Sequence, residues 1–381
     1  VRSRTTSVSL DSSTGNLTLI LDRGDRHSVL VRLGDGVGIA DKLARLLNQI
    51  HTGLDKVEAP DAATVVVRFK DSYAPFPNYT ASQWMPIAAH EVYDQDGSLQ
   101  KRLIGTGPFM FDEQASQKGS VWVVKKNPTY WDPGKPYIDE VRWFVLGDDA
   151  AAIAAFRAKQ IDLLNNTVLN YRQVEDLKKT MPQAQILPGT GYGGHIYLQT
   201  QRAPFDNEKV RQAIAQAIDR QRIIDNFYPA GSEVAQYFTP CAIPNACVGD
   251  PWYGFDVAAA KKLMADAGYP NGFKTKLSYR NVVRGYLPDP KGVAQDIQAQ
   301  LKANLGIDIT LDEQESTTFL DNADAGKLDG LYLLGWGADY PDMTNFVDYH
   351  FGGGSSAQFG KHFDDLVAAI SEGAAGANDD A

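Results

Sequence analysis

The sequence is short of positive charge and of long apolar runs. Its 381 residues carry 37 Lys and Arg against 47 Asp and Glu, a formal net charge of -10. Without a basic stripe, binding to nucleic acid or to an anionic membrane surface is disfavoured. No run approaches the ~20 consecutive apolar residues of a membrane helix. The polar start, Val1–Thr6, lacks the apolar core of a signal peptide.

The motifs of the common enzyme classes are also missing. There is no nucleophile elbow, P-loop or zinc-protease motif, and the six histidines are scattered singly. We therefore expect a protein that is not an enzyme and that has no metal site and no cofactor. One alternative is a nucleotide-dependent α/β enzyme, because the glycine run Gly34–Gly38 precedes a helical pattern over residues 39–50. In that run, however, Ile39 stands where the third glycine of a dinucleotide-binding turn belongs.

Cysteine is limited to Cys241 and Cys247, which lie in a loop rich in proline and glycine. With no further cysteine or nearby histidine, these residues are too few for a zinc site. We expect a local disulfide, which would stabilise the loop by roughly 2 kcal/mol and would indicate an oxidising compartment. Two free loop thiols are the alternative.

The length of the chain predicts two or three domains, and its 43% hydrophobic and 22% charged residues are typical of a soluble globular protein. Runs rich in β-branched and aromatic residues predict strands at residues 16–21, 28–33, 64–69, 121–124 and 141–145. A helix at residues 149–160 and a strand beginning at residues 160–162 follow. Because strand and helix patterns alternate from there on, α/β layers are expected.

Three further helices are predicted by apolar periodicity in the second half of the chain. They run from Asp206 or Asn207 through Ile224, from Asp256 to Gly268, and over residues 293–305 up to Gly306. The two glycines suit the left-handed position that ends many helices. The alternation of Ile307–Leu311 predicts a half-buried strand, and the tail Ser371–Ala381, without large apolar residues, is expected to be frayed or disordered.

A buried strand and a carboxylate follow one another after Gly330. Leu331–Leu334 is too short for a helix and suits a buried strand. Gly335 and Gly337 flank Trp336 and leave the backbone open to a close approach. Asp339 then stands at the start of a turn. From the residues alone, Asp339 is either the contact for a charged ligand or an ordinary strand end.

Six motifs, in the same order, give the sequence a family resemblance. They are Ile104–Phe109, Lys126–Trp131 with Lys135–Val141, Phe156–Asp162, Ala203–Arg220, Ala260–Phe273 and Leu331–Phe346. On these motifs the chain closely resembles the large solute-binding proteins of bacterial peptide ABC importers, the family of the dipeptide and oligopeptide binders. Residues 36–75 match more loosely.

The resemblance implies an α/β fold of the periplasmic-binding-protein type, with two lobes, an extra subdomain, mixed sheets flanked by helices and a ligand site between the lobes. Lobe I would span residues 1–194, with the smaller subdomain at about 36–100, and lobe II residues 195–381. Crossover strands are expected near Ile196–Thr200 and at the end of the chain. Family members extend further at both ends, so we expect a fragment or incomplete coverage, with lobe I incomplete and its return segment absent.

The resemblance also implies a function. The protein would capture peptides of two to a few residues and deliver them to the membrane permease of an ABC importer, without acting on them as an enzyme. It would be a monomer in the periplasm or at the cell surface, with a lipid anchor on the full-length precursor left open. Nucleic acid is not an expected partner.

Two residues are assigned roles by their place in the family's motifs. Asp339 occupies the place of the aspartate that binds the α-ammonium of the peptide, and Arg284 that of the arginine that binds the terminal carboxylate in dipeptide binders. A buried charge is costly unless it is paired, so a ligand carrying both charges would complete the site. We expect Trp336, Gly337, Tyr340 and Tyr286 to line the ligand as well. The alternatives are a surface role for Arg284 and a core role for Trp336.

Other ligands are compatible with the same fold. An oligosaccharide would need an aromatic platform, for which Trp336, Tyr279, Tyr286 and Trp252 are available. A metal chelate would need histidine or carboxylate contacts that the sequence does not bring together.

Overall fold

The structure is a computed structural model of the whole chain. It describes residues 6–11, 16–21, 28–29, 54–61, 64–70, 72–81, 90–96, 102, 104–164, 169, 171–187, 192–353, 355, 357–360 and 363–376. The glycine run at Gly34–Gly38, the helix expected over residues 39–50 and most of the strand expected at residues 28–33 lie outside these ranges. Within them, no helix is both long enough and apolar enough to cross a membrane.

The chain divides into two compact units, which are described separately. The first holds residues 1–148 with residues 372–381, and the second residues 149–371. These compact units are not the same division as the two lobes expected from the family resemblance. The lobe boundary near residue 194 therefore stays a prediction.

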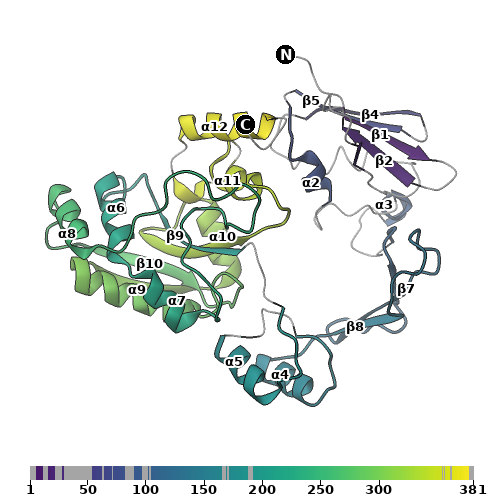
Figure 1. Cartoon of the computed structure of the whole chain (residues 1–381), viewed down its shortest axis with the longest axis horizontal. Coiled ribbons are helices and arrows are strands. Elements are labelled where there is room, and N and C mark those ends of the chain that lie inside the picture. Colours follow the sequence, from purple (N-terminus) through teal and green to yellow (C-terminus); the bar gives the residue numbers. More distant parts are fainter. Residues whose placement is uncertain are drawn as a thin grey trace. The chain divides into compact units, whose positions relative to one another are not determined.

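The first unit contains two antiparallel sheets (Figure 1). The larger has the order β3-β2-β1-β5-β4, formed by β1 (Thr6–Asp11), β2 (Asn16–Leu21), β3 (Ser28–Val29), β4 (Leu54–Asp61) and β5 (Thr64–Phe69). The smaller is formed by β6 (Phe109–Phe111), β7 (Val121–Lys126) and β8 (Glu140–Phe144). Two short helices, α2 (Phe76–Thr80) and α3 (His90–Asp96), complete the described part. The strands predicted at residues 16–21, 64–69, 121–124 and 141–145 are confirmed.

The second unit is built on one mixed sheet. Its elements in chain order are α4 (Asp149–Arg157), α5 (Tyr171–Thr180), β9 (Tyr192–Leu198), α6 (Glu208–Ala217), α7 (Arg220–Phe227), α8 (Val257–Asp266), β10 (Lys274–Arg280), α9 (Pro290–Leu305), β11 (Asp308–Gln314), α10 (Ser316–Asp324), β12 (Leu331–Gly337), α11 (Thr344–Phe351) and the 3-10 turn η1 (Ala357–Phe359). Helix α12 (Asp364–Ala375) follows.

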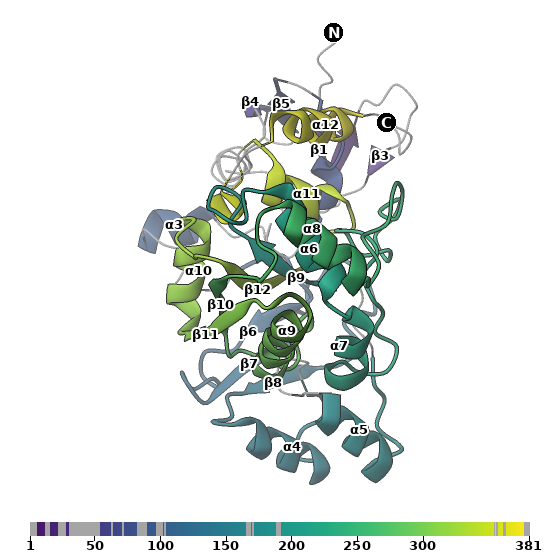
Figure 2. The same ribbon diagram turned by 90° about the vertical axis from the view of Figure 1, so that its left-hand side faces the viewer.

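The sheet has the strand order β11-β10-β12-β9. Strand β10 is parallel to both β11 and β12, whereas β9 is antiparallel to β12. The connection from β10 to β11 and the connection from β11 to β12 run in opposite directions across the sheet. Because such crossovers are right-handed, their helices α9 and α10 must lie on opposite faces, as Figure 2 shows.

The two faces of this sheet are packed differently. On the α9 face, aliphatic residues such as Leu277, Leu331 and Leu333 join Ile297 and Leu301 in the largest buried cluster. On the α10 face the cluster is smaller and more aromatic, and it contains Tyr197, Phe319, Ala323, Leu328, Tyr332 and Leu334. Leu331–Leu334 is therefore a buried strand, as predicted, with both faces covered.

The helix ends follow the expected chemistry with one exception. Asp256 caps α8, Gly306 ends α9 in the left-handed conformation, and Gly268 also has a positive φ of 89°. The single helix expected through Ile224 is wrong, because the chain forms α6 and α7 in its place. The break lies at Ile218, which is extended, and at Asp219, whose carboxylate accepts from the backbone of Arg222 and starts a new helix.

Two other expectations are corrected. Residues 161–164 pair with no strand in the described part of the chain, so the strand expected at residues 160–162 is wrong; the helix before it ends in a turn with Lys159 at positive φ. The tail was expected to be frayed or disordered from Ser371, yet α12 continues to Ala375. Its alanines favour helix, and Ala374 is buried while its carbonyl accepts from the backbone of Ala74 at 2.8 Å.

Candidate functional site

The expected site residues lie beyond one end of the mixed sheet. We define the carboxyl edge as the ends of β10, β11 and β12 at Arg280, Gln314 and Gly337, the start of β9 at Tyr192, and the loops that follow the three strands. In open α/β sheets, ligands bind outside the carboxyl ends of strands whose following helices pass to opposite faces. Strands β10 and β11 meet that condition, so the topology alone indicates this edge as the place for a ligand.

Asp339 lies just beyond β12 and is held by Asn345 in the first turn of α11. The Asp339 amide donates to Asn345 Oδ1 at 2.9 Å, and Asn345 Nδ2 lies 3.4 Å from Asp339 Oδ2. The same Oδ1 accepts from Trp336 Nε1 at 3.1 Å. Asn345 is itself buried. One buried amide therefore fixes both the tryptophan and the half-buried carboxylate that the sequence singled out.

Trp336 and Tyr340 are less available than their neighbour Asp339. Trp336 is half-buried and stacks on Tyr349, with ring centroids 4.0 Å apart. Tyr340 is only 7% exposed, and its hydroxyl lies 3.3 Å from Thr344 Oγ1. Tyr340 thus supports the start of α11 and offers little surface to a ligand, whereas Trp336 could offer one face.

The two glycines of β12 allow other groups to approach the backbone closely. The groups that do so are side chains of the protein itself. A Cβ on Gly335 would lie 2.5 Å from the Tyr286 ring, and a Cβ on Gly337 would lie 2.6 Å from the Tyr192 ring. Gly335 also faces the carbonyl of Gly193 on β9. The glycines therefore seat two tyrosines against the sheet at its carboxyl edge.

Arg284 and Tyr286 lie in the tight loop between β10 and α9. The loop is closed by reciprocal backbone hydrogen bonds between Arg284 and Leu287, of 3.2 and 3.0 Å. The half-buried Arg284 donates from Nη1 to the carbonyl of Val283, and it forms no ion pair with a described carboxylate. Tyr286 accepts from Tyr228 at its carbonyl and from Arg280 at its hydroxyl.

The structure therefore brings Asp339 and Arg284 to loops at one edge of one sheet, after the neighbouring strands β12 and β10. Trp336 and Tyr286 lie on opposite faces of β12: Tyr286 covers Gly335 on the α9 face, and Trp336 contacts α11. Sequence reasoning missed Arg280, Tyr192 and Asn345. The polar alternation of residues 274–280 was the signal for a strand ending at Arg280.

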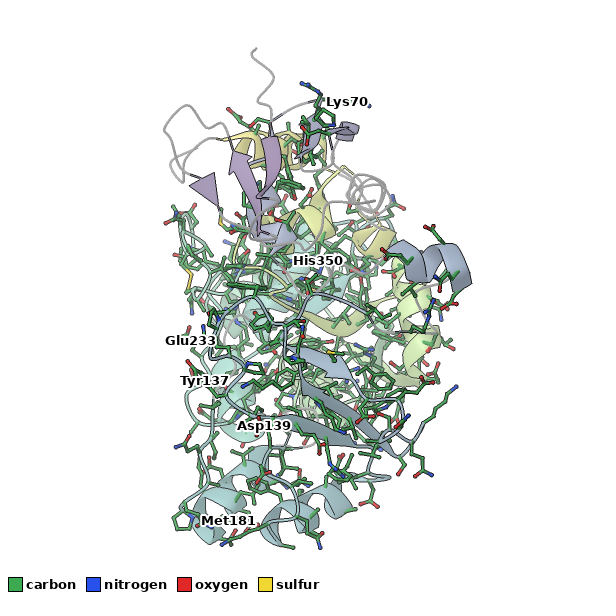
Figure 3. The ribbon with its side chains drawn as sticks, turned by 90° about the vertical axis from the view of Figure 1, so that its right-hand side faces the viewer. Lys70, Tyr137, Asp139, Met181, Glu233 and His350 are labelled. Atoms are coloured by element: carbon green, nitrogen blue, oxygen red, sulfur yellow. A yellow bond between two sulfur atoms is a disulfide. The ribbon has the colours of Figure 1, made fainter. Side chains whose placement is uncertain are left out.

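An aromatic cluster with two histidines lies behind this edge. His195 on β9 stacks on Phe238, and His350 on α11 (Figure 3) lies edge-on to Trp336. His350 Nδ1 pairs with the carbonyl of Phe346 at 2.6 Å, and its Nε2 pairs with the Tyr197 hydroxyl at 3.1 Å. Burial lowers the pKa of each histidine to about 4, so both are neutral near pH 7.

The loop with the two cysteines packs onto the same region. Cys241 and Cys247 form a disulfide with Cα atoms 5.2 Å apart. Between them, Ile243 and Ala246 are buried against Phe346, with Phe238 and Trp336 packed alongside. The disulfide loop thus covers part of the support beneath Trp336.

The sugar platform considered from the sequence is not assembled. Tyr279 is 2% exposed, its hydroxyl donates to Glu313 at 2.9 Å, and burial raises its pKa to about 12. Trp252 is 43% exposed, but it lies in the loop before α8. Of the four aromatic residues, only Trp336 and Tyr286 belong to the carboxyl edge.

This architecture defines a class: an α/β binding protein with a periplasmic-binding-protein-like fold. The chain belongs to family 5 of the bacterial extracellular solute-binding proteins, whose middle-region family model matches residues 20–358. Both the resemblance drawn from the six motifs and the fold class that it implied are confirmed. The family is one of binding proteins.

Relatives with known names share long stretches with the chain. It is 30% identical over 303 residues to heme-binding protein A of Haemophilus influenzae and 26% identical over 269 residues to the periplasmic oligopeptide-binding protein OppA of Escherichia coli. These alignments cover 77% and 69% of this chain, and 54% and 48% of the relatives. The chain therefore spans about half the length of the curated relatives that it matches.

The fold is shared with solved structures. One is the ABC transporter-associated periplasmic binding protein DppA of Helicobacter pylori in complex with the peptide STSA. It superposes with a TM-score of 0.76 at 22% identity, covering 98% of this chain and 77% of that one. At this identity the likeness shows the fold.

Proposed function

We propose that the protein is the substrate-binding component of a bacterial ABC importer, and that it captures short peptides outside the cytoplasm and delivers them to the membrane permease. No bond is made or broken in this role. The observation that carries the proposal is the placement of a carboxylate and a guanidinium on two adjacent loops of the carboxyl edge. A peptide carries the complementary pair, an α-ammonium and a terminal carboxylate.

In this proposal Asp339 binds the α-ammonium. Its backbone and carboxylate are both positioned by Asn345, so little ordering is needed when a ligand arrives. Arg284 binds the terminal carboxylate, for which a planar guanidinium can supply two parallel hydrogen bonds. Affinity then depends on the two ends of the peptide, and selectivity for its side chains is low. The family and the DppA complex with a peptide support this reading.

Heme is the second candidate, because heme-binding protein A is 30% identical to the chain. His350, one of the two histidines of the aromatic cluster, does not favour it. His350 is 3% exposed and both its ring nitrogens have hydrogen-bond partners, so it offers no nitrogen to an iron atom. Because the relative is named for heme binding, hemin is included as a separate ligand in the test.

The test is calorimetry with four forms of one dipeptide: free, N-acetylated, C-amidated and blocked at both ends. We expect the free form to bind most tightly and each blocked form to lose about a hundredfold or more in affinity, since each removes one charge pair between ligand and site. Equal binding of the free and N-acetylated forms would contradict the proposal. So would saturable binding of hemin without binding of any dipeptide.

A matched pair of variants sharpens the test. Asp339→Asn removes the charge expected to bind the ammonium, and Asp321→Asn removes the same charge from an exposed position on α10. Only the first should weaken binding of the free dipeptide. Native mass spectrometry of freshly purified protein gives an independent check, because a co-purified peptide would appear as added mass.

A further inference from the structure

Arg280, the last residue of β10, is the most deeply buried cation of the carboxyl edge. It is 9% exposed. Its Nη1 donates to Ser316 Oγ at 2.8 Å and its Nη2 to the Tyr286 hydroxyl at 3.0 Å. A guanidinium has five N–H donors, so three of them have no acceptor among the described residues.

Both partners of Arg280 are neutral, although its own charge is permanent. Arginine stays protonated in proteins, and a buried charge is costly unless it is paired with an opposite one. The nearby carboxylates are engaged elsewhere. Asp312 accepts from Ser278 and Gln314, and Glu313 accepts from Tyr279. The exposed Glu315 caps α10 through the backbone of Thr318.

Elsewhere in the same unit a buried charge is paired. Asp296 is 8% exposed, and its carboxylate accepts from Arg222 Nη2 at 2.6 Å and from Gln300 Nε2 at 2.6 Å. The difference is one of location: Asp296 lies on α9 within the core, whereas Arg280 lies where ligands of such sheets bind. A buried cation without its counter-charge at that edge is suited to an anion that comes from outside.

We propose that Arg280 is a second anion-binding group of the site, which binds a carboxylate of the ligand additional to the terminal carboxylate at Arg284. This rests on the proposed function and specifies its ligand class. One carboxylate at Asp339 and two guanidiniums at Arg280 and Arg284 are complementary to one ammonium and two carboxylates. Those are the charges of a short peptide with an aspartate or glutamate side chain.

The hydroxyls of Ser316 and Tyr286 have a positioning role. They take one donor from each terminal nitrogen of Arg280 and orient the plane of the guanidinium without neutralising it. The Tyr286 ring is fixed over Gly335. Arg280 is therefore preorganised, which lowers the ordering cost of binding.

The test is a cycle between protein and ligand. Calorimetry compares Asp-Ala with Asn-Ala, and Ala-Asp with Ala-Asn, on the wild type and on Arg280→Gln. For at least one pair, we expect the wild type to prefer the acidic peptide by about a hundredfold and Arg280→Gln to lose that preference, because each uncharged partner leaves a buried charge unpaired. Arg211→Gln is the matched control, since Arg211 donates to the backbone carbonyls of Phe205 and Asp206 on the segment that leads into α6. It should keep the preference.

A second measurement keeps the inference testable if Arg280→Gln does not fold or if the wild type binds no dipeptide. Formate is titrated into wild-type protein labelled with 15N-arginine, and the Nε signal of Arg280 is assigned by its loss in Arg280→Lys. A saturable shift of that signal is expected. If no dipeptide binds the wild type, the proposed function fails, while the formate titration still decides whether Arg280 binds a carboxylate.

Two results would overturn the inference. One is an equal loss of affinity for the acidic and amide peptides in Arg280→Gln, which would make Arg280 a structural support of the loop. The other, where no dipeptide binds, is the absence of any shift of the Arg280 signal with formate.

Discussion

The two ends of the mixed sheet are built on different principles. At the amino edge, where β10, β11 and β12 begin, backbone packs directly on backbone. A Cβ on Gly272 would lie 2.4 Å from the carbonyl of Gly306, and a Cβ on Gly330 would lie 2.5 Å from the carbonyl of Lys276. At the carboxyl edge, charged side chains occupy the loops. The amino edge is closed by its own chain, whereas the carboxyl edge carries the charged side chains that we propose bind a ligand.

In our proposal, the difference separates two roles of one sheet: stability at the amino edge and ligand binding at the carboxyl edge. Changes at the amino edge should cost folding free energy, because nothing there can move aside. Changes to the charges of the carboxyl edge should cost affinity instead, and changes to the groups that support this edge should affect both. The predictions below test that division, from the largest expected effect to the smallest.

Among the substitutions, Gly272→Ala should have the largest effect on stability. The new methyl group meets the Gly306 backbone, and Gly272 has a positive φ of 76°, so we expect a loss of about 3–4 kcal/mol in the free energy of unfolding. Gly268→Ala is the matched control: its φ is 89°, but nothing lies within 4 Å of its Cβ position. It should lose only about 1–2 kcal/mol, the cost of the left-handed conformation. Urea denaturation measures both, and equal losses would mean that packing at the amino edge is not tight.

Acidification should destabilise the fold through His195 and His350. Their pKa values are about 4 in the folded protein, against an ordinary value of 6.5. Below pH 6.5 the unfolded chain binds protons that the folded chain does not, so stability is complete above pH 6.5 and falls towards pH 4. The expected loss is about 3 kcal/mol per histidine over that range.

Urea denaturation at pH 7 and pH 5 checks this, since most carboxylates are charged at both values. His350→Phe should remove about half of the difference between the two pH values. A pH dependence unchanged by that variant would show that other groups cause it.

Asn345→Ala tests the support of the carboxyl edge. It leaves Trp336 Nε1 and the amide of Asp339 without their shared acceptor, so we expect a loss of about 2–3 kcal/mol in stability. Peptide affinity should fall as well, because Asp339 loses its positioning. Asn304→Ala, which removes a hydrogen bond to the carbonyl of Ala217, is the control for stability and should leave affinity unchanged.

Removing the disulfide should have the smallest effect. Replacing Cys241 and Cys247 by serine frees a short loop, and we expect a loss of about 2 kcal/mol in the free energy of unfolding. The comparison is between oxidised wild type and the double variant in urea. An unchanged midpoint would mean that the loop is held by Ile243 and Ala246 alone.

Most of the fold in the second unit follows from local signals in the sequence. Asp256 and Gly306 bound their helices as cap chemistry predicts, and Leu331–Leu334 forms the buried strand. Strand β10 was not predicted, because Lys274, Lys276 and Arg280 make its sequence look like an exposed segment. Its burial comes from the neighbouring elements of the fold. The break at Asp219 also escaped periodicity, since the apolar face continues across it.

The sequence allowed single residues of the candidate site to be predicted, but not the contacts between them. Asp339 and Arg284 came from family motifs, and nothing local indicated that Asn345 holds Trp336 and Asp339 together. That contact depends on how α11 folds back onto the end of β12. Arg280 was missed for a related reason: its burial is a tertiary property, and an arginine in a sequence is ordinarily a surface residue.

The most direct test of the central claim is a calorimetric cycle of wild type and Asp339→Asn with a free and an N-acetylated dipeptide. If Asp339 binds the α-ammonium, acetylation should weaken binding to the wild type by about a hundredfold and binding to Asp339→Asn by much less, because the charge pair is already lost. Equal effects of acetylation on both proteins would contradict the claim that the carboxyl edge recognises the peptide amine through Asp339.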